Sequence, residues 1–319
     1  MATIHKNLIF SLKLMLSAGL VWYAFSKFDT FSSFALLEFL LSYTVFFGVT
    51  LLFIQNFLVA LRLQKLLLLL KSKCSFLVAL DAVIIGTFFS QTFISFIGGD
   101  SMRVWRLNTK EISLTTAIKA VFFDRLLGFI GLILIIIPSI FILINLLRDT
   151  YISNILIILV VIAIIGFVIF LLMYKISVSL KRFRIISIIS NLSKNAQHIF
   201  YYPSYVLILV SNSILIQLLN IIVIFVLASG LSIEISFINC LVLIPPVLFL
   251  SMMPISIAGW GVREGAMVIS LGLIDIPASQ SVTLSVCYGF SLVLVSLPGG
   301  FLWIMNRHKV STKDQSVTI

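Results

Sequence analysis

The amino-acid sequence predicts an all-α, polytopic helical membrane protein with about six full spans plus two re-entrant helix pairs in an inverted-topology repeat. Three observations predict this class. First, 61% of the 319 residues are apolar and only 10% are charged, whereas soluble domains have about 45–50% apolar and about 25% charged residues. Second, the apolar residues form long runs. Third, the basic residues are confined to a few of the segments between those runs.

Eight apolar runs follow one another along the chain. They cover residues 8–26, 35–61, 76–97, 118–147, 153–174, 203–229, 237–257 and 281–305. Most reach the length of about 20 residues that a helix needs to cross a hydrocarbon core of about 30 Å. The first run resembles a signal peptide, but Lys13 interrupts it and no A-x-A cleavage site follows, so we expect it to be retained.

Basic residues between the runs predict the orientation, because loops rich in Lys and Arg stay cytoplasmic. Most of the 22 basic residues fall in one set of segments. They are Lys6; Arg62, Lys65, Lys71 and Lys73; Arg103, Arg106, Lys110 and Lys119; Lys175, Lys181, Arg182, Arg184 and Lys194; and Arg307, Lys309 and Lys313. With all of these on the cytoplasmic side, both termini are cytoplasmic as well.

This orientation requires the run 76–97 to begin and end on the same side of the membrane. A re-entrant hairpin meets that requirement if it turns at Gly98 and Gly99 and returns along residues 101–110. The run from 237 repeats the pattern from the other side, with a break at 254–261 and a return along 262–273. Residues 1–150 and 151–306 then form two inverted repeats, and 307–319 form a cytoplasmic tail. The alternative is a full crossing by 76–97, with Arg103, Arg106 and Lys110 outside.

The segment IGGDSMR, residues 97–103, is the first polar site inside an apolar region. Gly98 and Gly99 permit a tight turn, Asp100 can cap the following half-helix, and Arg103 lies one turn further on. The alternative is a cytoplasmic loop with a helix cap.

The segment PISIAGWGVREG, residues 254–265, is the second polar site. Irregular backbone in lipid must be covered by protein or must face a wet cavity, so glycines around Arg263 and Glu264 indicate a cavity. The alternatives are an external loop with an exposed ion pair and, for Trp260, an interfacial anchor.

Asp124 and Arg125 form the third polar site, near the start of a long apolar run. Adjacent helical positions point about 100° apart, so the two side chains must find partners elsewhere. The candidate partners are Asp100, Arg103, Arg263 and Glu264. The alternative is that both side chains extend to the cytoplasmic interface. The amides of Gln55, Asn56, Gln91, Gln217 and Asn220 are expected to bridge helices.

Half-helices that begin after Asp100 and after Gly261 would direct their N-terminal dipoles into a shared cavity. Such a cavity favours an anion such as a phosphate, and Arg103 and Arg263 would strengthen the preference. Lipid head groups carry phosphates of this kind.

Several function classes are excluded by the same inspection. No phosphate-binding P-loop and no GxSxG nucleophile turn occurs, so we expect no nucleotide-driven chemistry and no cofactor. The three cysteines and three histidines have no metal-ligand spacing, so we expect no metal site. Despite a net charge of +11, the composition excludes a nucleic-acid-binding domain.

The segments FFSQTFISFIGGDSMRVWRL, KAVFFDRLLGFIGL and MPISIAGWGVREGA resemble, in order and spacing, the transmembrane domain of lysylphosphatidylglycerol synthases and their stand-alone flippase-like relatives. The resemblance implies a lipid-translocating module without catalytic residues. The positions that match the family's polar positions are Gly98, Gly99, Asp100, Arg103, Asp124, Arg125, Gly259, Gly261, Arg263, Glu264 and Gly265. Many relatives carry Tyr-Arg in the last helix, whereas here Gly289 follows Tyr288. We expect no lysyl transfer, because no soluble synthase domain is found in these residues.

The predicted function is therefore translocation of an anionic or zwitterionic membrane lipid, or of a lipid-linked sugar, across the cell membrane. One alternative is a polyprenyl-phosphate-dependent glycosyltransferase, although its acidic candidates Asp29, Asp149, Glu234 and Asp275 lie far apart. Another is a non-transporting partner of a lipid-modifying enzyme. A homo-oligomer is also compatible with the sequence.

Overall fold

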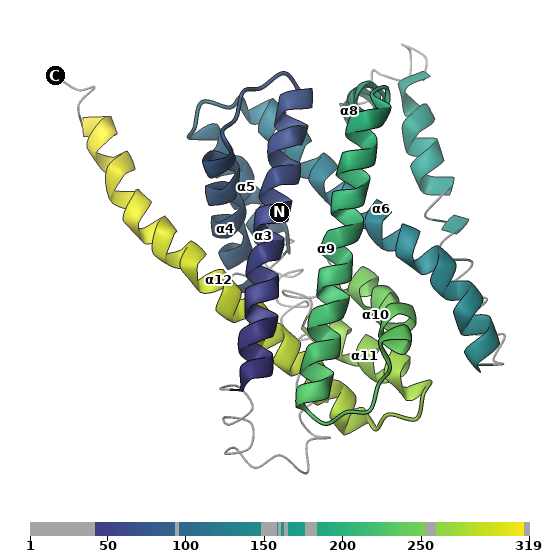
Figure 1. Ribbon diagram of the computed structural model, residues 1–319. Coiled ribbons are helices and arrows are strands. Elements are labelled where there is room, and N and C mark those ends of the chain that lie inside the picture. The colour runs from purple at the N-terminus through teal and green to yellow at the C-terminus, as the bar shows by residue number, and fades with distance from the viewer. Residues whose placement is uncertain are drawn as a thin grey trace, which may run out of the picture.

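The computed structural model describes residues 42–92, 96–147, 158, 161–162, 165–175, 184–252 and 260–315. In these residues all regular secondary structure is helical (Figure 1). The first predicted run, 8–26, lies outside the described residues. Of the run 153–174, an apolar helix over Ile165–Lys175 is described, and it ends in the short 3-10 helix η1, Met173–Lys175.

Within the part of the chain that the structure describes, four helices are long and apolar enough to cross a membrane. They are α3 (Tyr43–Leu69), α6 (Leu114–Leu147), α9 (Pro203–Gly230) and α12 (Ala278–Gln315). Each corresponds to a predicted span. The protein is therefore a helical membrane protein, and large apolar side chains such as Phe46 and Phe301 cover its outer surface.

Two pairs of shorter helices lie between the long ones. The first pair is α4 (Phe76–Thr92) and α5 (Phe96–Asn108), and the second is α10 (Phe237–Ser251) and α11 (Val262–Gly272). At 1.5 Å per residue, α4 is about 25 Å long and α5 about 20 Å, which is less than a hydrocarbon core of about 30 Å. Both helices are shorter than the four long ones.

The order long, short, short, long thus occurs twice, as α3–α6 and as α9–α12. In Figure 1, α3 and α9 lie side by side and run in opposite directions. The α4–α5 pair lies toward one end of the molecule, and the α10–α11 pair toward the other. The amphipathic helix α8 (Arg184–Phe200) precedes α9 and packs on the Ile165–Lys175 segment, where Ser193 donates a hydrogen bond to the carbonyl oxygen of Leu171.

Glycines allow α5 to lie directly against α4. A Cβ on Gly99 would fall 2.5 Å from the carbonyl oxygen of Gly86, and one on Gly86 would fall 2.3 Å from Cγ of Arg103. Residues later in α5 therefore meet residues earlier in α4, so the two helices are antiparallel. The predicted turn at Gly98 and Gly99 is wrong, because α5 already begins at Phe96 and both glycines are helical.

The long helices α6 and α12 each contact both short pairs. Arg125, early in α6, binds Asp100 of α5, and Ser139, later in α6, donates a hydrogen bond to the carbonyl oxygen of Leu241 in α10. Ser285, early in α12, binds Arg263 of α11, and Gly299, later in α12, packs on the backbone of α4 at Ile84. Both helices therefore cross the molecule obliquely (Figure 1).

Candidate functional site

A cavity of ≈ 210 Å³ lies where the two halves of the molecule meet. All eight helices of the two repeated units contribute to its wall. Its polar lining comprises Gln55, Asn56, Arg62, Thr87, Ser90, Gln91, Arg103, Asp124, Arg125, Gln217, Asn220, Ser251, Arg263 and Tyr288. In a membrane protein, such a concentration of polar groups in the interior indicates a functional site, because burying charge in apolar surroundings is costly.

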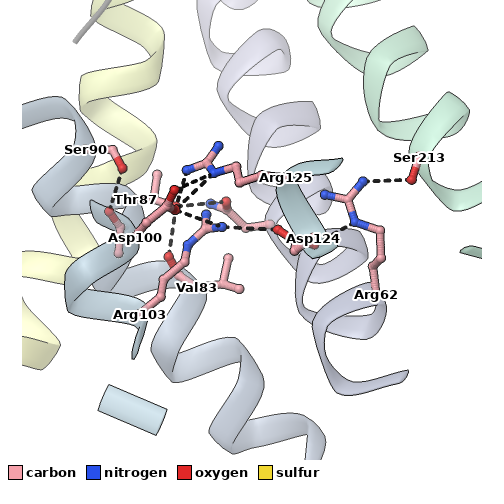
Figure 2. A network of polar contacts seen from close by, with 11 residues as sticks. Arg62, Val83, Thr87, Ser90, Asp100, Arg103, Asp124, Arg125 and Ser213 are labelled. Carbon is pink, nitrogen blue, oxygen red and sulfur yellow. Dashed lines mark hydrogen bonds and ion pairs between the residues drawn. The ribbon is translucent and has the colours of Figure 1, made fainter. Parts of the chain in front are cut away.

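The wall formed by α3, α5 and α6 holds buried ion pairs centred on Asp124 (Figure 2). The Asp124 carboxylate accepts a hydrogen bond of 2.7 Å from Nε of Arg62 and one of 3.3 Å from Nη1 of Arg103. Arg62 also donates to Oγ of Ser213 in α9, at 2.8 Å. The Asp124 carboxylate in α6 thus binds one arginine from α3 and one from α5, and Arg62 also binds a fourth helix, α9.

Arg125 points to a different carboxylate from its neighbour, as expected for adjacent helical positions. Its Nε and Nη2 lie 2.8 Å and 2.6 Å from the two oxygens of Asp100 in α5. Nη1 of Arg103 lies 4.0 Å from Asp100 and so joins both pairs. We call Arg62, Asp100, Arg103, Asp124 and Arg125 the first charge cluster. Among the residues that the structure describes, its three arginines face two carboxylates, so these five side chains carry one positive charge in excess.

The second charge cluster is Arg263 and Glu264, at the N-terminal end of α11. Nη2 of Arg263 lies 2.9 Å from Oε1 of Glu264, and Ser285 bridges the two, accepting from Nε of Arg263 and donating to the carboxylate. The backbone N–H of Gly261, a residue with φ of 85°, donates to the other Glu264 oxygen. This pair is therefore neutral, and Glu264 caps its own helix.

Two aromatic rings hold the Arg263 guanidinium in place. Its central carbon lies 4.8 Å from the ring of Trp260 and 5.6 Å from the ring of Tyr288, within the range of cation–π attraction. A Cβ on Gly289 would fall 2.2 Å from Nη2 of Arg263 and 3.0 Å from Trp260. Arg263 and Trp260 thus occupy the space next to position 289, where the resemblance implied an arginine.

A chain of amide hydrogen bonds connects the two sides of the cavity. The hydroxyl of Tyr288 donates to Asn220, Asn220 donates to Gln217, and Gln217 donates to the carbonyl oxygen of Gly128 in α6. These bonds confirm that Gln217 and Asn220 bridge helices. Asn56 in α3 also bridges, accepting from Thr87 of α4 at 3.5 Å.

The structure places the six charged residues among the predicted site residues in the cavity wall or next to it. Arg103, Asp124, Arg125 and Arg263 line it, and Asp100 and Glu264 pair with them. Asp124 is only 2% exposed, so it does not extend to the interface. The alternative of loops is wrong for Arg103 and Arg263, which lie within helices.

Other predicted positions have different roles. Asp100 does not cap a half-helix that follows it, because it is the fifth residue of α5. The half-helix predicted to begin after Gly261 is confirmed, since α11 begins at Val262. Gly99 packs against α4, whereas Gly265 is exposed with open space around it. Gly259 lies outside the described residues.

Arg62 is the main residue that the sequence reasoning missed. Its position directly after the apolar run 35–61 predicts a cytoplasmic loop, but α3 continues to Leu69, and Arg62 is only 5% exposed. Two features of the sequence are compatible with a buried Arg62. Asp124 lies in an apolar run and requires a cation, and Gln55, seven residues before Arg62, indicates a polar face on the same helix. Ser213 and Ser285 had no signal in the sequence.

No group of three or more His, Cys, Asp or Glu side chains suited to a metal ion occurs among the described residues. A model of the family described as the lysylphosphatidylglycerol synthase TM region matches residues 10–299 of the chain. Comparison with curated proteins and with solved structures gives no match.

Proposed function

The chain belongs to the family of lysylphosphatidylglycerol synthase transmembrane regions, and from this premise we propose that it moves a phospholipid, or a lipid-linked sugar, between membrane leaflets without hydrolysing nucleotide. It resides in the cell membrane and binds the lipid by its phosphate. The family and the apolar helices support the membrane location, and the charged lining of the cavity supports binding of a phosphate-bearing head group.

The observation that carries the proposal is the excess positive charge of the first charge cluster. Arg62 and Arg103 share the single carboxylate of Asp124, and all three line the cavity. An unneutralised guanidinium in apolar surroundings is unfavourable, and a phosphate that enters the cavity would balance it with strong, charge-assisted hydrogen bonds. The neutral second charge cluster offers no such excess.

The arrangement of helices supports a transport route through this site. We propose that the α4–α5 and α10–α11 pairs are re-entrant and enter from opposite faces, as two halves of an inverted-topology repeat. The doubled order of long and short helices supports this proposal, as does the position of the cavity between the halves. Inverted repeats permit a site near the midplane to open to each side in turn.

The proposal is tested with purified protein in phospholipid vesicles that contain a trace of fluorescent phospholipid. The fraction of label accessible to an external quencher is followed over time. We expect exchange between leaflets with the native chain and a rate at least about tenfold lower with Arg103→Ala, because a lost charged hydrogen bond is worth about 1.5–3 kcal/mol. Lys110→Ala, which removes a cation from an exposed loop, is the matched control. Equal rates in protein-free and protein-containing vesicles would contradict the proposal.

A further inference from the structure

Three polar atoms of the cavity wall have no hydrogen-bond partner among the described residues. They are Nδ2 of Asn56, Oε1 of Gln91 and Nε of Arg103, and all three residues line the cavity. They come from three successive helices, α3, α4 and α5, on the side of the first charge cluster. Buried polar groups in folded proteins are nearly always hydrogen-bonded, so three such atoms in one cavity mark a place where a polar ligand can bind.

The chemistry of these atoms restricts that ligand. Asn56 Nδ2 and Arg103 Nε are donors, and Arg103 belongs to the cluster with the excess positive charge. They suit the oxygens of a phosphate. Gln91 Oε1 is an acceptor, so it suits an N–H or O–H group on the same ligand.

We propose that the cavity selects lipids whose head group carries both a phosphate and a hydrogen-bond donor, and that Gln91 Oε1 accepts a hydrogen bond from this donor. The donor is an amino or a hydroxyl group. The inference rests on the proposed function and narrows its substrate class. A phosphocholine head group has the phosphate but no N–H or O–H, so it would leave Gln91 Oε1 buried and unpaired.

The test compares three short-chain, water-soluble phospholipids of equal net charge, each titrated into the purified full chain in detergent by calorimetry. They are dihexanoyl phosphatidylethanolamine, its N,N-dimethyl derivative and dihexanoyl phosphatidylcholine. The dimethyl derivative is nearly as bulky as choline but keeps one N–H. We expect the first two lipids to bind at least about tenfold more tightly than the choline lipid, because a site built for a donor rejects an analogue that lacks it.

Equal affinities for the three lipids would overturn the proposal. So would a dimethyl derivative that binds as weakly as the choline lipid, because the order would then follow size. Phosphoethanolamine, which has no acyl chains, tests whether the ligand is a lipid or a soluble phosphate ester with the same two groups. Binding as tight as that of the lipid would mean that the cavity takes a soluble phosphate ester, and it would contradict a lipid ligand.

Variants assign the effect to Gln91. Gln91→Leu is expected to reduce the affinity for the ethanolamine lipid to that for the choline lipid, and to leave the choline affinity unchanged, which also shows that the variant is folded. Asn212→Leu is the matched control, since Asn212 Oδ1 is also buried without a partner but does not line the cavity. An unchanged preference in Gln91→Leu would overturn the role of Gln91.

Failure of this inference is distinguishable from failure of the proposed function. If vesicles containing the protein exchange the choline lipid as fast as the ethanolamine lipid, translocation stands and the selectivity is refuted. If the protein binds the lipids with the expected preference but exchanges none of them, the selectivity stands and translocation is refuted.

Discussion

Asp124 forms ion pairs with the buried arginines of the first charge cluster. Its carboxylate is the partner of both Arg62 and Arg103, and the Asp124 side chain is 2% exposed. Removing one partner of a buried ion pair leaves the other charge uncompensated, which is more destabilising than removing the whole pair. The stability of the helix bundle around the cavity is therefore tied to this one carboxylate.

Asp124→Asn is accordingly expected to lower the free energy of unfolding by roughly 3–5 kcal/mol. Thermal unfolding in detergent measures the change as a fall in the midpoint temperature. Glu234→Gln is the matched control, because Glu234 is an exposed carboxylate outside the helices and its loss is expected to shift the midpoint little. If Asp124→Asn and the control unfold at the same midpoint temperature, the Asp124 carboxylate does not stabilise the helix bundle as proposed.

Most charged residues of the site could be predicted from the sequence, but which of them form ion pairs could be predicted only in part. Asp124 and Arg125 needed partners, and Asp100 and Arg103 were the correct candidates from the first half. Arg62 was hidden because an arginine at the end of an apolar run has the same local sequence whether the helix stops there or continues. Its contact with Asp124, 62 positions further along the chain, distinguishes the two cases.

At the scale of helices, glycines act mainly through their small size. Gly98 and Gly99 predict a turn, because glycine permits unusual backbone angles, yet Gly99 lies in a helix and allows the close approach of α5 to α4. The local sequence cannot separate these two uses of glycine, since the second depends on the neighbouring helix. At Gly261 the conformational use is real, because φ is 85°.

The packing of α12 on α4 provides a test at this scale. A Cβ on Gly299 would lie 2.2 Å from the carbonyl oxygen of Ile84 and 2.9 Å from Cβ of Phe88. Because a backbone atom cannot move alone, Gly299→Ala must push the two helices apart, and we expect a loss of roughly 1–3 kcal/mol in unfolding free energy.

Gly265→Ala is the matched control for this substitution. Gly265 lies in α11 with nothing within 4 Å of an added Cβ. Replacing an exposed helical glycine by alanine is expected to stabilise the protein by roughly 0.5–1 kcal/mol. Both variants are measured by thermal unfolding, and a stabilising effect of Gly299→Ala would refute the close packing.

At the scale of the whole molecule, the length pattern of the helices was predictable and their boundaries were not. Apolar runs and clustered cations predict six full spans and two short pairs; the described residues contain both short pairs and four of the long helices. The run 35–61 predicted a helix that lies over Tyr43–Leu69 instead. Hydropathy averages over a window, whereas the ends of a helix are set by its tertiary contacts.

The proposed opposite orientation of the two pairs predicts where the loops after α5 and α11 are exposed. Thr109→Cys and Asp275→Cys, each in a chain without its native cysteines, are treated in intact cells with a membrane-impermeant maleimide. We expect label at Asp275→Cys without permeabilisation, and at Thr109→Cys only after it. Reintroduced Cys74, in the loop before α4, is the control for the Thr109 side. Labelling of both variants from one side would contradict the inverted repeat.

The most direct measurement of the central claim is a density map of the protein in a phospholipid bilayer disc, at a resolution that shows phosphates. We predict density for a phosphate inside the cavity, within hydrogen-bond distance of Arg103 Nε and Asn56 Nδ2. A map that shows lipid phosphates only along the outer surface, with the cavity filled by protein side chains, would contradict it.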